Sequence, residues 1–430
     1  MAVRLSQSDA DFEARFAALL GSKREVAEDV DKTVRGIVED VRARGDAALI
    51  AYTEKFDRLA LTPDRLAISP EAMEAAEASV PARDRAALML ACSRIEAHHK
   101  RQVPKDDRYT DPIGVELGTR WTAIDSVGLY VPGGTAAYPS TVLMNAVPAK
   151  VAGVKRVVMV VPTPDGIINP LVLAAARVAG VDEIYRVGGA QAVAALAFGT
   201  ETIAPVAKIM GPGNAYVAAA KRLVFGTVGI DLIAGPSEVL IVADAENDPD
   251  WIAADLLAQA EHDTAAQAIL VTTSAELGDH VAAAVERQLS VLPRGEIAGA
   301  SWEEHGAIIV VDSLASAMDL ANRIAAEHVE LAVADPEALL PQLRNAGAVF
   351  LGRHTPEVIG DYVAGSNHVL PTARSARFSS GLSVLDFMKR TSLLKLGPDQ
   401  LQALSGAAIA LAEAEGLGAH ARSVSIRLNR

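Results

Sequence analysis

The stretch VGIDLIAGPSEVLIVADAENDPDWIAADLLAQAEHD, residues 228–263, contains a Gly-Pro-Ser turn, a buried strand and a helix in succession. Residues 239–242 are all apolar and mostly β-branched, which is the pattern of a strand covered on both faces. Asp248 and Pro249 predict the start of a helix, because Asp can accept a backbone N–H bond and Pro has no N–H to leave unpaired. A strand that leads directly into a helix indicates an α/β fold.

The predicted helix carries a polar stripe. Four side chains at spacings of four, four and three residues share one side of it: Trp251, Asp255, Gln259 and His262. The adjoining apolar face consists of Ile252, Ala253, Leu256 and Ala260. The stripe places a Gln amide oxygen beside a His nitrogen, and both groups can bind a metal ion. On spacing alone, however, Q-x-x-H is more typical of a solvated helix face.

Strands alternate with helices on both sides of this stretch. Before it, we expect strands at 123–131, 154–161 and 182–187 and helices at 140–152 and 169–180. After it, the expected strands are 268–272, 307–311, 330–333 and 348–351, and the helices 275–289, 314–326 and 336–345. This order predicts an α/β fold with two Rossmann-like parallel-sheet domains, at residues 121–235 and 236–381.

The two ends of the chain have other patterns. Residues 1–120 predict a helical N-terminal segment, with helices within 26–52 and 70–100, and His98 and His99 are expected at the surface. Residues 352–382 are rich in Gly, Ser, Pro and Asn and predict a long functional loop. Residues 382–430 predict a small helical tail with a helix at 399–414 and a terminal strand at 424–428.

Composition limits the classes of protein. The chain has 430 residues, half of them apolar, and a net charge of −14 without a basic stripe, so neither nucleic acid nor an anionic membrane is an expected partner. Its single cysteine, Cys92, cannot form an intrachain disulfide, and it lies in an Ala-rich helical stretch that indicates packing rather than reactivity. Without a signal-peptide core or a run of about 20 apolar residues, the sequence predicts a cytoplasmic protein.

Three glycine-containing turns are candidates to replace the G-x-G-x-x-G motif of dinucleotide-binding domains. No G-x-G-x-x-G follows a strand, but glycines stand at three predicted strand-to-helix junctions: 128–134, 188–191 and 211–214. Backbone N–H groups at such junctions are free to meet an anion, although each turn alone is explained by turn geometry. Together they indicate a dinucleotide site in the first domain.

The segments IDLIAGPSE, residues 230–238, and QAEHD, residues 259–263, resemble the signature of the histidinol dehydrogenases. The similarity extends from about residue 128 to residue 420. The resemblance implies a zinc-dependent, NAD-dependent oxidoreductase that converts L-histidinol to L-histidine through L-histidinaldehyde with two NAD⁺. It also implies a homodimer in which the tail residues Glu415 and His420 reach the active site of the neighbour.

The resemblance also implies roles for individual residues. Glu327 and His328 match the acid/base pair: a histidine can remove the alcohol proton while a carboxylate activates water. The zinc ligands are Gln259, His262, Asp361 and His420, the last two expected in glycine-rich connections. The residues implied for NAD are Tyr130, Gln191 and Asn214. Those implied for the substrate are Ser237, Gln259, His262, His328, Asp361, His368, Glu415 and His420.

Other interpretations compete with this one. Glu327-His328 could be an ordinary polar helix end, Ser237 a loop cap and Glu415 a solvated residue. For the whole chain, the alternatives are a zinc hydrolase, a non-catalytic protein with two ligand-binding lobes, and a dehydrogenase of another amino alcohol. The last is the strongest rival, because such motifs report the chemistry better than the size of a substrate side chain.

Overall fold

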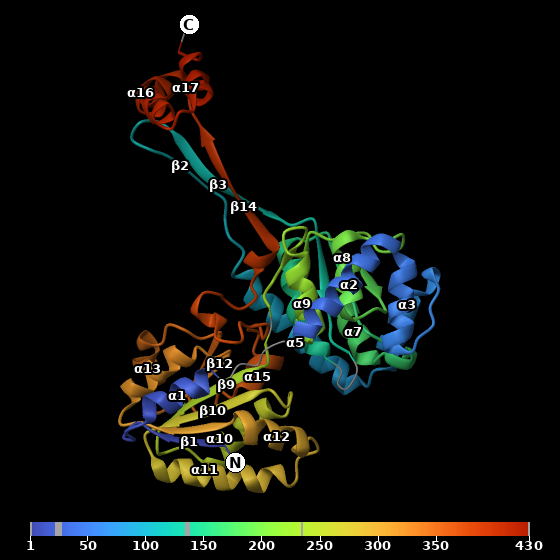
Figure 1. Ribbon diagram of the computed structural model, residues 1–430, viewed down its shortest axis with the longest axis vertical. Coiled ribbons are helices and arrows are strands. Elements are labelled where there is room, and N and C mark those ends of the chain that lie inside the picture. Colours follow the sequence, from blue (N-terminus) through green and yellow to red (C-terminus); the bar gives the residue numbers. More distant parts are fainter. Residues whose placement is uncertain (1, 22–27, 134–137, 234, 429–430) are drawn as a thin grey trace.

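The computed structural model describes residues 2–21, 28–133, 138–233 and 235–428, which form two α/β lobes and a projecting arm (Figure 1). The predicted fold class, with two parallel sheets, is confirmed. The predicted domain boundaries stay predictions. Among the described residues, no helix has the length and apolar character needed to cross a bilayer.

The first lobe contains a five-stranded parallel sheet of order β6-β5-β4-β7-β8. Its strands are β4 (Ser126–Tyr130), β5 (Arg156–Val160), β6 (Glu183–Tyr185), β7 (Lys208–Met210) and β8 (Gly229–Ile230). The helices that follow the first four strands are α6 (Pro139–Ala152), α7 (Pro170–Val178), α8 (Gly189–Phe198) and α9 (Ala215–Val224). Side chains alternate between two apolar layers: Val127 and Leu129 face one, and Val158 and Val160 face the other. Both layers are covered, which explains the continuous apolar runs.

The N-terminal helices pack against the helices that flank this first sheet. They are α2 (Glu28–Arg44), α3 (Asp46–Asp57), α4 (Pro70–Ser79) and α5 (Ala82–Lys100). The helix predicted within 26–52 is two helices, separated at Gly45, which has a φ of +55°. The prediction that His99 lies at the surface is wrong, because its side chain is 0% exposed, whereas its neighbour His98 is exposed.

The second lobe contains a six-stranded parallel sheet of order β1-β11-β10-β9-β12-β13. Its strands are β1 (Val3–Ser6), β9 (Glu238–Ala243), β10 (Gln267–Thr272), β11 (Ala307–Val310), β12 (His328–Ala332) and β13 (Ala348–Leu351). Its helices are α1 (Phe12–Gly21), α10 (Pro249–Ala260), α11 (Ala275–Leu289), α12 (Gly295–His305), α13 (Leu314–Ile324), α14 (Pro336–Leu339) and α15 (Glu357–Tyr362). Asp248 caps α10 by accepting the N–H of Asp250 at 2.8 Å, as its position before Pro249 predicts. Apart from β1, both sheets have the same order, with the first strand in the centre and the switch point beside it.

Two segments differ from the sequence-based expectation of helices before residue 120. Strand β1 pairs in parallel with β11, so the chain starts in the second lobe before it builds the first. Strands β2 (Asp107–Thr110) and β3 (Glu116–Ala123) pair with β14 (Met388–Lys395) in an antiparallel ribbon. This ribbon is the arm, and it carries α16 (Pro398–Ala414) and α17 (Gly418–Ser425) at its far end (Figure 1).

The predicted terminal strand at residues 424–428 is wrong, because α17 continues to Ser425 and ends in a turn. The N–H of Ile426 bonds to the carbonyl of Arg422 at 3.0 Å, so this backbone is helical. The buried residue of α17 is Ala421, in the part of the helix that packs against α16. The contact of α17 with α16 therefore decides this structure, and the short alternation of apolar residues at 424–428 does not.

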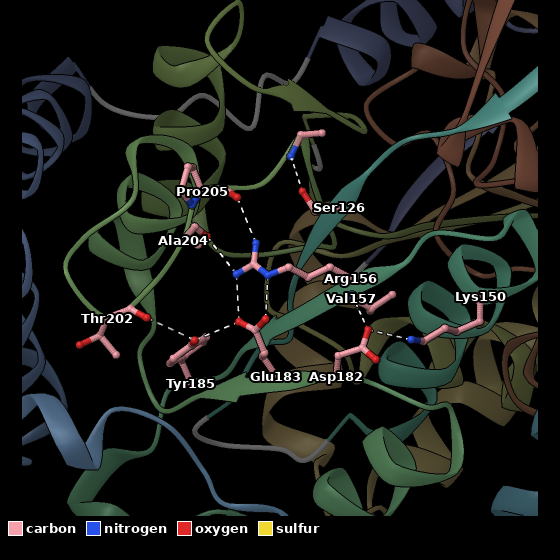
Figure 2. Close-up of polar contacts among 11 residues, drawn as sticks. Ser126, Lys150, Arg156, Val157, Asp182, Glu183, Tyr185, Thr202, Ala204 and Pro205 are labelled. Atoms are coloured by element: carbon pink, nitrogen blue, oxygen red, sulfur yellow. Dashed lines mark hydrogen bonds and ion pairs between the residues drawn. The ribbon is translucent and has the colours of Figure 1, made fainter.

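A polar network closes the amino edge of the first sheet (Figure 2). The guanidinium of Arg156 donates to both carboxylate oxygens of Glu183, at 2.7 and 2.9 Å, and to the carbonyls of Ala204 and Pro205. Glu183 also accepts the hydroxyl of Tyr185 at 2.9 Å. Since the strands β4, β5 and β6 all begin here, this edge is filled by the protein's own side chains and a ligand is expected at the opposite edge.

Candidate active site

The predicted pair Glu327 and His328 lies at the amino end of β12, beside the amino end of β9, in the second lobe. Strand β12 begins at His328, which pairs with Val239 of β9. The N–H of Glu238 donates to Glu327 Oε2 at 2.9 Å, and the carbonyl of Glu238 accepts from His328 Nδ1 at 3.1 Å. The two peptide groups flanking one residue thus hold both side chains, and both residues are at most 5% exposed. The interpretation of this pair as an ordinary exposed helix end is wrong.

The contact with Glu238 selects the tautomer of His328. A carbonyl oxygen has no proton to give, so Nδ1 must carry the hydrogen. In the neutral ring, Nε2 is then the nitrogen that can accept a proton. Nε2 lies 3.3 Å from Asp361 Oδ1, which favours a proton between these two acceptors.

Further carboxyl groups surround the imidazole. Glu357 Oε2 lies 3.6 Å from His328 Nδ1, and Glu327 Oε2 lies 3.8 Å from it. Burial opposes the charged imidazolium, but the carboxylates of Glu357, Glu327 and Asp361 outweigh it and raise the pKa of His328 well above its usual value. Burial raises the pKa of Glu327 to about 7 and that of Glu357 to about 8. These two carboxyl groups can therefore exchange protons near neutral pH.

Asp361 and His368 come from the segment after β13. Asp361 lies within α15, not in a glycine-rich connection as predicted, because residues 357–362 form a short helix. His368 Nδ1 donates to the carbonyl of Asp361 at 3.0 Å, and its Nε2 lies 3.5 Å from the hydroxyl of Thr141 on α6. Helix α6 follows β4, so Thr141 lies at the carboxyl edge of the first sheet. Its contact with His368 therefore joins this edge to the amino edge of the second sheet. The site therefore lies between the two lobes.

Gln259 and His262 lie at the end of α10. The helix stops at Ala260, so His262 lies after it. The prediction that His262 lies on the helix is therefore wrong. Gln259 is 1% exposed, and its Nε2 has no hydrogen-bond partner among the described residues. The interpretation of this stripe as a solvated face is therefore wrong at Gln259. Burial lowers the pKa of His262 and favours the neutral ring that a metal ion requires.

The remaining predicted residues lie at different places. Ser237 immediately precedes Glu238 and is half-buried, with its carbonyl accepting the N–H of Gln267 at 3.0 Å. Glu415 follows α16 and His420 lies within α17, so both stand at the end of the arm, away from the two lobes (Figure 1). The expectation of a glycine-rich connection at His420 is wrong, because this residue is helical. One chain does not bring Glu415 or His420 together with the other site residues.

The donors fit a metal ion only in part within one chain. In the described part of the chain, no group of three His, Cys, Asp or Glu side chains could hold a metal ion. Gln259 provides a buried amide whose nitrogen has no partner among the described residues, and an exchange of its nitrogen and oxygen would place an acceptor there. With His262 and Asp361 it makes a mixed O/N set that suits Zn²⁺ but lacks a fourth ligand.

The glycine turns of the first lobe meet at the carboxyl edge of its sheet. Tyr130 ends β4, and its hydroxyl accepts the N–H of Gly189 at the start of α8, at 3.0 Å. Gln191, in the same helical turn, is 1% exposed, and its Oε1 has no partner among the described residues. Asn214 caps α9 by accepting the N–H groups of Tyr216 and Val217. These residues surround the switch point between β4 and β7, where α/β sheets bind dinucleotides. Gly134 lies outside the described residues.

At the same edge of the first sheet, a buried ion pair holds the turn after β7. Lys221 and Asp231 pair with side chains that are each 3% exposed. Lys221 Nζ donates to the carbonyl of Gly211 at 3.0 Å, and Asp231 accepts the N–H of Gly211 at 2.6 Å. Gly211 has a φ of +108°, and a Cβ there would collide with the carbonyl of Tyr130. The pair therefore fixes a turn that accepts only glycine.

We expect Lys221→Met to destabilise the protein by about 3–5 kcal/mol, because it leaves the carboxylate of Asp231 buried without its partner. Chemical denaturation measures this change. The matched control is Arg222→Met on the next residue, whose ion pair with Asp31 is exposed and should contribute little. Equal stability of the two variants would show that the buried pair does not hold the turn.

Comparison with known proteins assigns the family. The family model described as histidinol dehydrogenase matches residues 21–428. The chain is 70% identical over 429 residues to the histidinol dehydrogenase of Agrobacterium fabrum, covering 100% of this chain and 99% of that protein. It is 69% identical over 429 residues to the enzyme of Brucella suis, covering both chains fully. The chain belongs to the histidinol dehydrogenase family. The crystal structure of histidinol dehydrogenase from Elizabethkingia anophelis superposes with a TM-score of 0.95 at 38% identity, covering 99% of this chain and 98% of that one.

Membership of the histidinol dehydrogenase family makes the chain an enzyme. The candidate residues of its two lobes lie at opposite sheet edges. In the second sheet the carboxyl edge is closed: Arg353 bonds to both carboxylate oxygens of Asp244, at 2.7 and 2.8 Å, and Asn247 donates to the carbonyl of Ala332 at 2.6 Å. The candidate residues Glu327 and His328 lie at the opposite, amino edge. Open α/β sheets usually bind their ligands at the carboxyl edge.

Sequence reasoning missed two residues of the site, Glu238 and Glu357. Glu238 ends the IDLIAGPSE segment, so its place directly before a buried strand was a usable signal. Glu357 gave no signal, because its proximity to His328 depends on how the chain returns after β13.

Proposed function

We propose that this enzyme oxidises L-histidinol to L-histidine through L-histidinaldehyde, with two NAD⁺ per substrate and a bound Zn²⁺. The family membership supports the substrate. The observation that carries the chemistry is the buried pair Glu327 and His328, held by the peptide groups of Glu238. Burial raises the pKa of Glu327 to about 7 and that of the neighbouring Glu357 to about 8. A base and a second carboxyl group within one enclosed site suit two successive proton-coupled oxidations.

In the first oxidation, the neutral form of His328 takes the proton of the substrate hydroxyl on Nε2 while the hydride leaves the substrate carbon for NAD⁺. The raised pKa of His328 makes this neutral form a stronger base. The Nδ1 contact with Glu238 keeps the ring oriented. Glu357, 3.6 Å from Nδ1, stabilises the imidazolium when its carboxyl group is ionised.

In the second oxidation, Glu327 helps water add to the aldehyde, and the hydrated aldehyde is then oxidised. A covalent thiohemiacetal route would require a reactive cysteine. Cys92, the single cysteine of the chain, lies on α5 of the first lobe, and burial raises the pKa of its thiol. Its Sγ is 4.0 Å from the carbonyl of Val178, which indicates a packing role. Water is therefore the proposed nucleophile.

The NAD site is proposed at the carboxyl edge of the first sheet. Tyr130 and Gly189 fix the start of α8, and the amide oxygen of Gln191, which has no partner among the described residues, is available to a ligand. The side chain of Asn214 uses its oxygen as a cap, so its amide N–H groups remain as donors. The N-termini of α8 and α9 direct backbone N–H groups toward an anion at this edge.

The proposed zinc ligands are Gln259, His262 and Asp361, with His420 supplied by a second copy of the chain. A bound zinc ion would orient the substrate by binding the imidazole and amino nitrogens of the substrate. Zinc has no redox chemistry of its own. The position of His420 at the end of the arm supports this arrangement, because it cannot complete the site of its own chain.

A homodimer also accounts for the exposed surface of the arm. Leu394 on β14 is 65% exposed, Leu411 on α16 is 66% exposed and Ile426 after α17 is 52% exposed. Apolar side chains on an extended projection are characteristic of a surface that a second subunit covers. The same dimer would bring Glu415 and His420 to the site of the neighbour.

Removal of the metal tests the ligand assignment. We expect a chelator to reduce turnover at least about 100-fold, because the substrate loses its orienting group, and Zn²⁺ to restore it. Equilibrium dialysis followed by metal analysis should give one Zn²⁺ per chain, and Gln259→Leu should reduce this value. Full activity in a preparation shown to be metal-free would contradict the assignment.

A further inference from the structure

Helix α5 of the N-terminal segment holds the loop that leads to His368. Arg94 donates to the carbonyls of Val363 at 2.6 Å and Ala364 at 2.9 Å. The next residue, Gly365, has a φ of +107°, and a Cβ there would lie 2.8 Å from the carbonyl oxygen of Arg94. The backbone of this loop is therefore fitted closely to one turn of α5.

One helical turn further along, His99 continues this contact. It is 0% exposed, and its Nδ1 lies 2.7 Å from the carbonyl oxygen of Ile95, so Nδ1 carries the hydrogen. Nε2 is consequently an acceptor, and Asn367 Nδ2 lies 3.3 Å from it. Burial lowers the pKa of His99, which keeps this ring neutral and able to accept.

Both the nitrogen and the oxygen of the Asn367 amide form hydrogen bonds. Its Nδ2 also donates to the carbonyl of Met144 on α6, at 2.7 Å, and its Oδ1 accepts the N–H of Val369 at 2.9 Å. The side chain of Asn367 thus links α5 and α6 to the backbone of Val369, the residue after His368. The imidazole of His368 then has one orientation, with Nδ1 on the carbonyl of Asp361 and Nε2 near Thr141.

We propose that His99, acting through Asn367, is a positioning residue that sets His368 for the substrate. This inference rests on the proposed function, together with the role in substrate contact that the family resemblance implies for His368. The Nε2 of His99 accepts one of the two N–H groups of Asn367, and without it that buried donor would have no partner. The loop would then gain freedom at the residue next to His368, while the cofactor residues of the first sheet would keep their places.

Two substitutions of His99 separate this role from simple packing. Asparagine can keep the N–H bond to Ile95 but has no atom at the position of Nε2. Glutamine can place an amide oxygen near the position of Nε2, where it can accept from Asn367. His98→Gln on the adjacent, exposed position is the matched control.

The experiment measures KM for L-histidinol, KM for NAD⁺, kcat and melting temperature in the intact enzyme. We expect His99→Asn to raise KM for L-histidinol about tenfold, the effect of one lost buried hydrogen bond, without changing KM for NAD⁺. His99→Gln should recover most of this loss, and His98→Gln should match the wild type. The inference is overturned if His99→Asn lowers the melting temperature alone, or if both variants raise both KM values equally.

His368→Asn separates a failure of this inference from a failure of the proposed function. If His368→Asn leaves KM for L-histidinol unchanged, His368 does not contact the substrate and both proposals about it fail. If His368→Asn raises KM and His99→Asn does not, only the role of His99 fails. The double variant should show a KM close to that of His368→Asn, because both changes act through the same side chain.

Discussion

His328→Asn should lower kcat about 10³-fold or more with a small change in the melting temperature. The amide nitrogen of asparagine can still donate to the carbonyl of Glu238, so the local structure is retained. The proton acceptor at Nε2 is lost, and general base catalysis contributes roughly 10²–10⁴-fold. Steady-state NADH formation and thermal unfolding measure the two effects. His354→Asn, at an exposed position in the same lobe, is the control. A variant that keeps a tenth of the wild-type kcat would show that His328 is not the base.

Glu327→Gln should block the second oxidation more than the first. The glutamine oxygen can still accept the N–H of Glu238, but the amide cannot activate water. We expect oxidation of added L-histidinaldehyde to fall about 10²–10³-fold. Oxidation of L-histidinol to the aldehyde should fall much less. Glu337→Gln, at an exposed position before β13, is the control.

The pH dependence of the second oxidation checks the same residue. Burial raises the pKa of Glu327 to about 7, so the carboxylate is mostly protonated at pH 6 and mostly ionised at pH 8. The active base form therefore increases as the pH rises, and wild-type aldehyde oxidation should increase roughly tenfold over this interval. Glu327→Gln should lose this increase. An equal pH response in the variant would assign the titration to another group.

The strands and helices around the site were predictable because their signals are local. The apolar run of β9 and the Asp248-Pro249 start of α10 identify both elements within a few residues. Strand β1 was not predictable in this way. It has four residues, and its partner β11 lies about three hundred residues away in the sequence. The apparent strand at residues 424–428 was wrong for the opposite reason, because a brief alternation was read without its packing partner, α16.

The residues of the site were predictable in type but not in arrangement. The family resemblance selected Glu327 and His328, yet only the fold shows that Glu238 holds both and that Glu357 lies beside the ring. His99 was placed at the surface because helical spacing alone does not reveal the loop that covers it. Conversely, the position of His420 at the end of the arm could not be read from the sequence.

The yield of NADH per molecule of limiting L-histidinol, measured with the zinc-loaded enzyme and excess NAD⁺, tests the central claim most directly. The proposed mechanism predicts two NADH and one L-histidine for each L-histidinol. A yield of one NADH with release of L-histidinaldehyde would contradict the role of Glu327 in a second oxidation. No NADH from L-histidinol, but turnover of another amino alcohol, would contradict the proposed substrate.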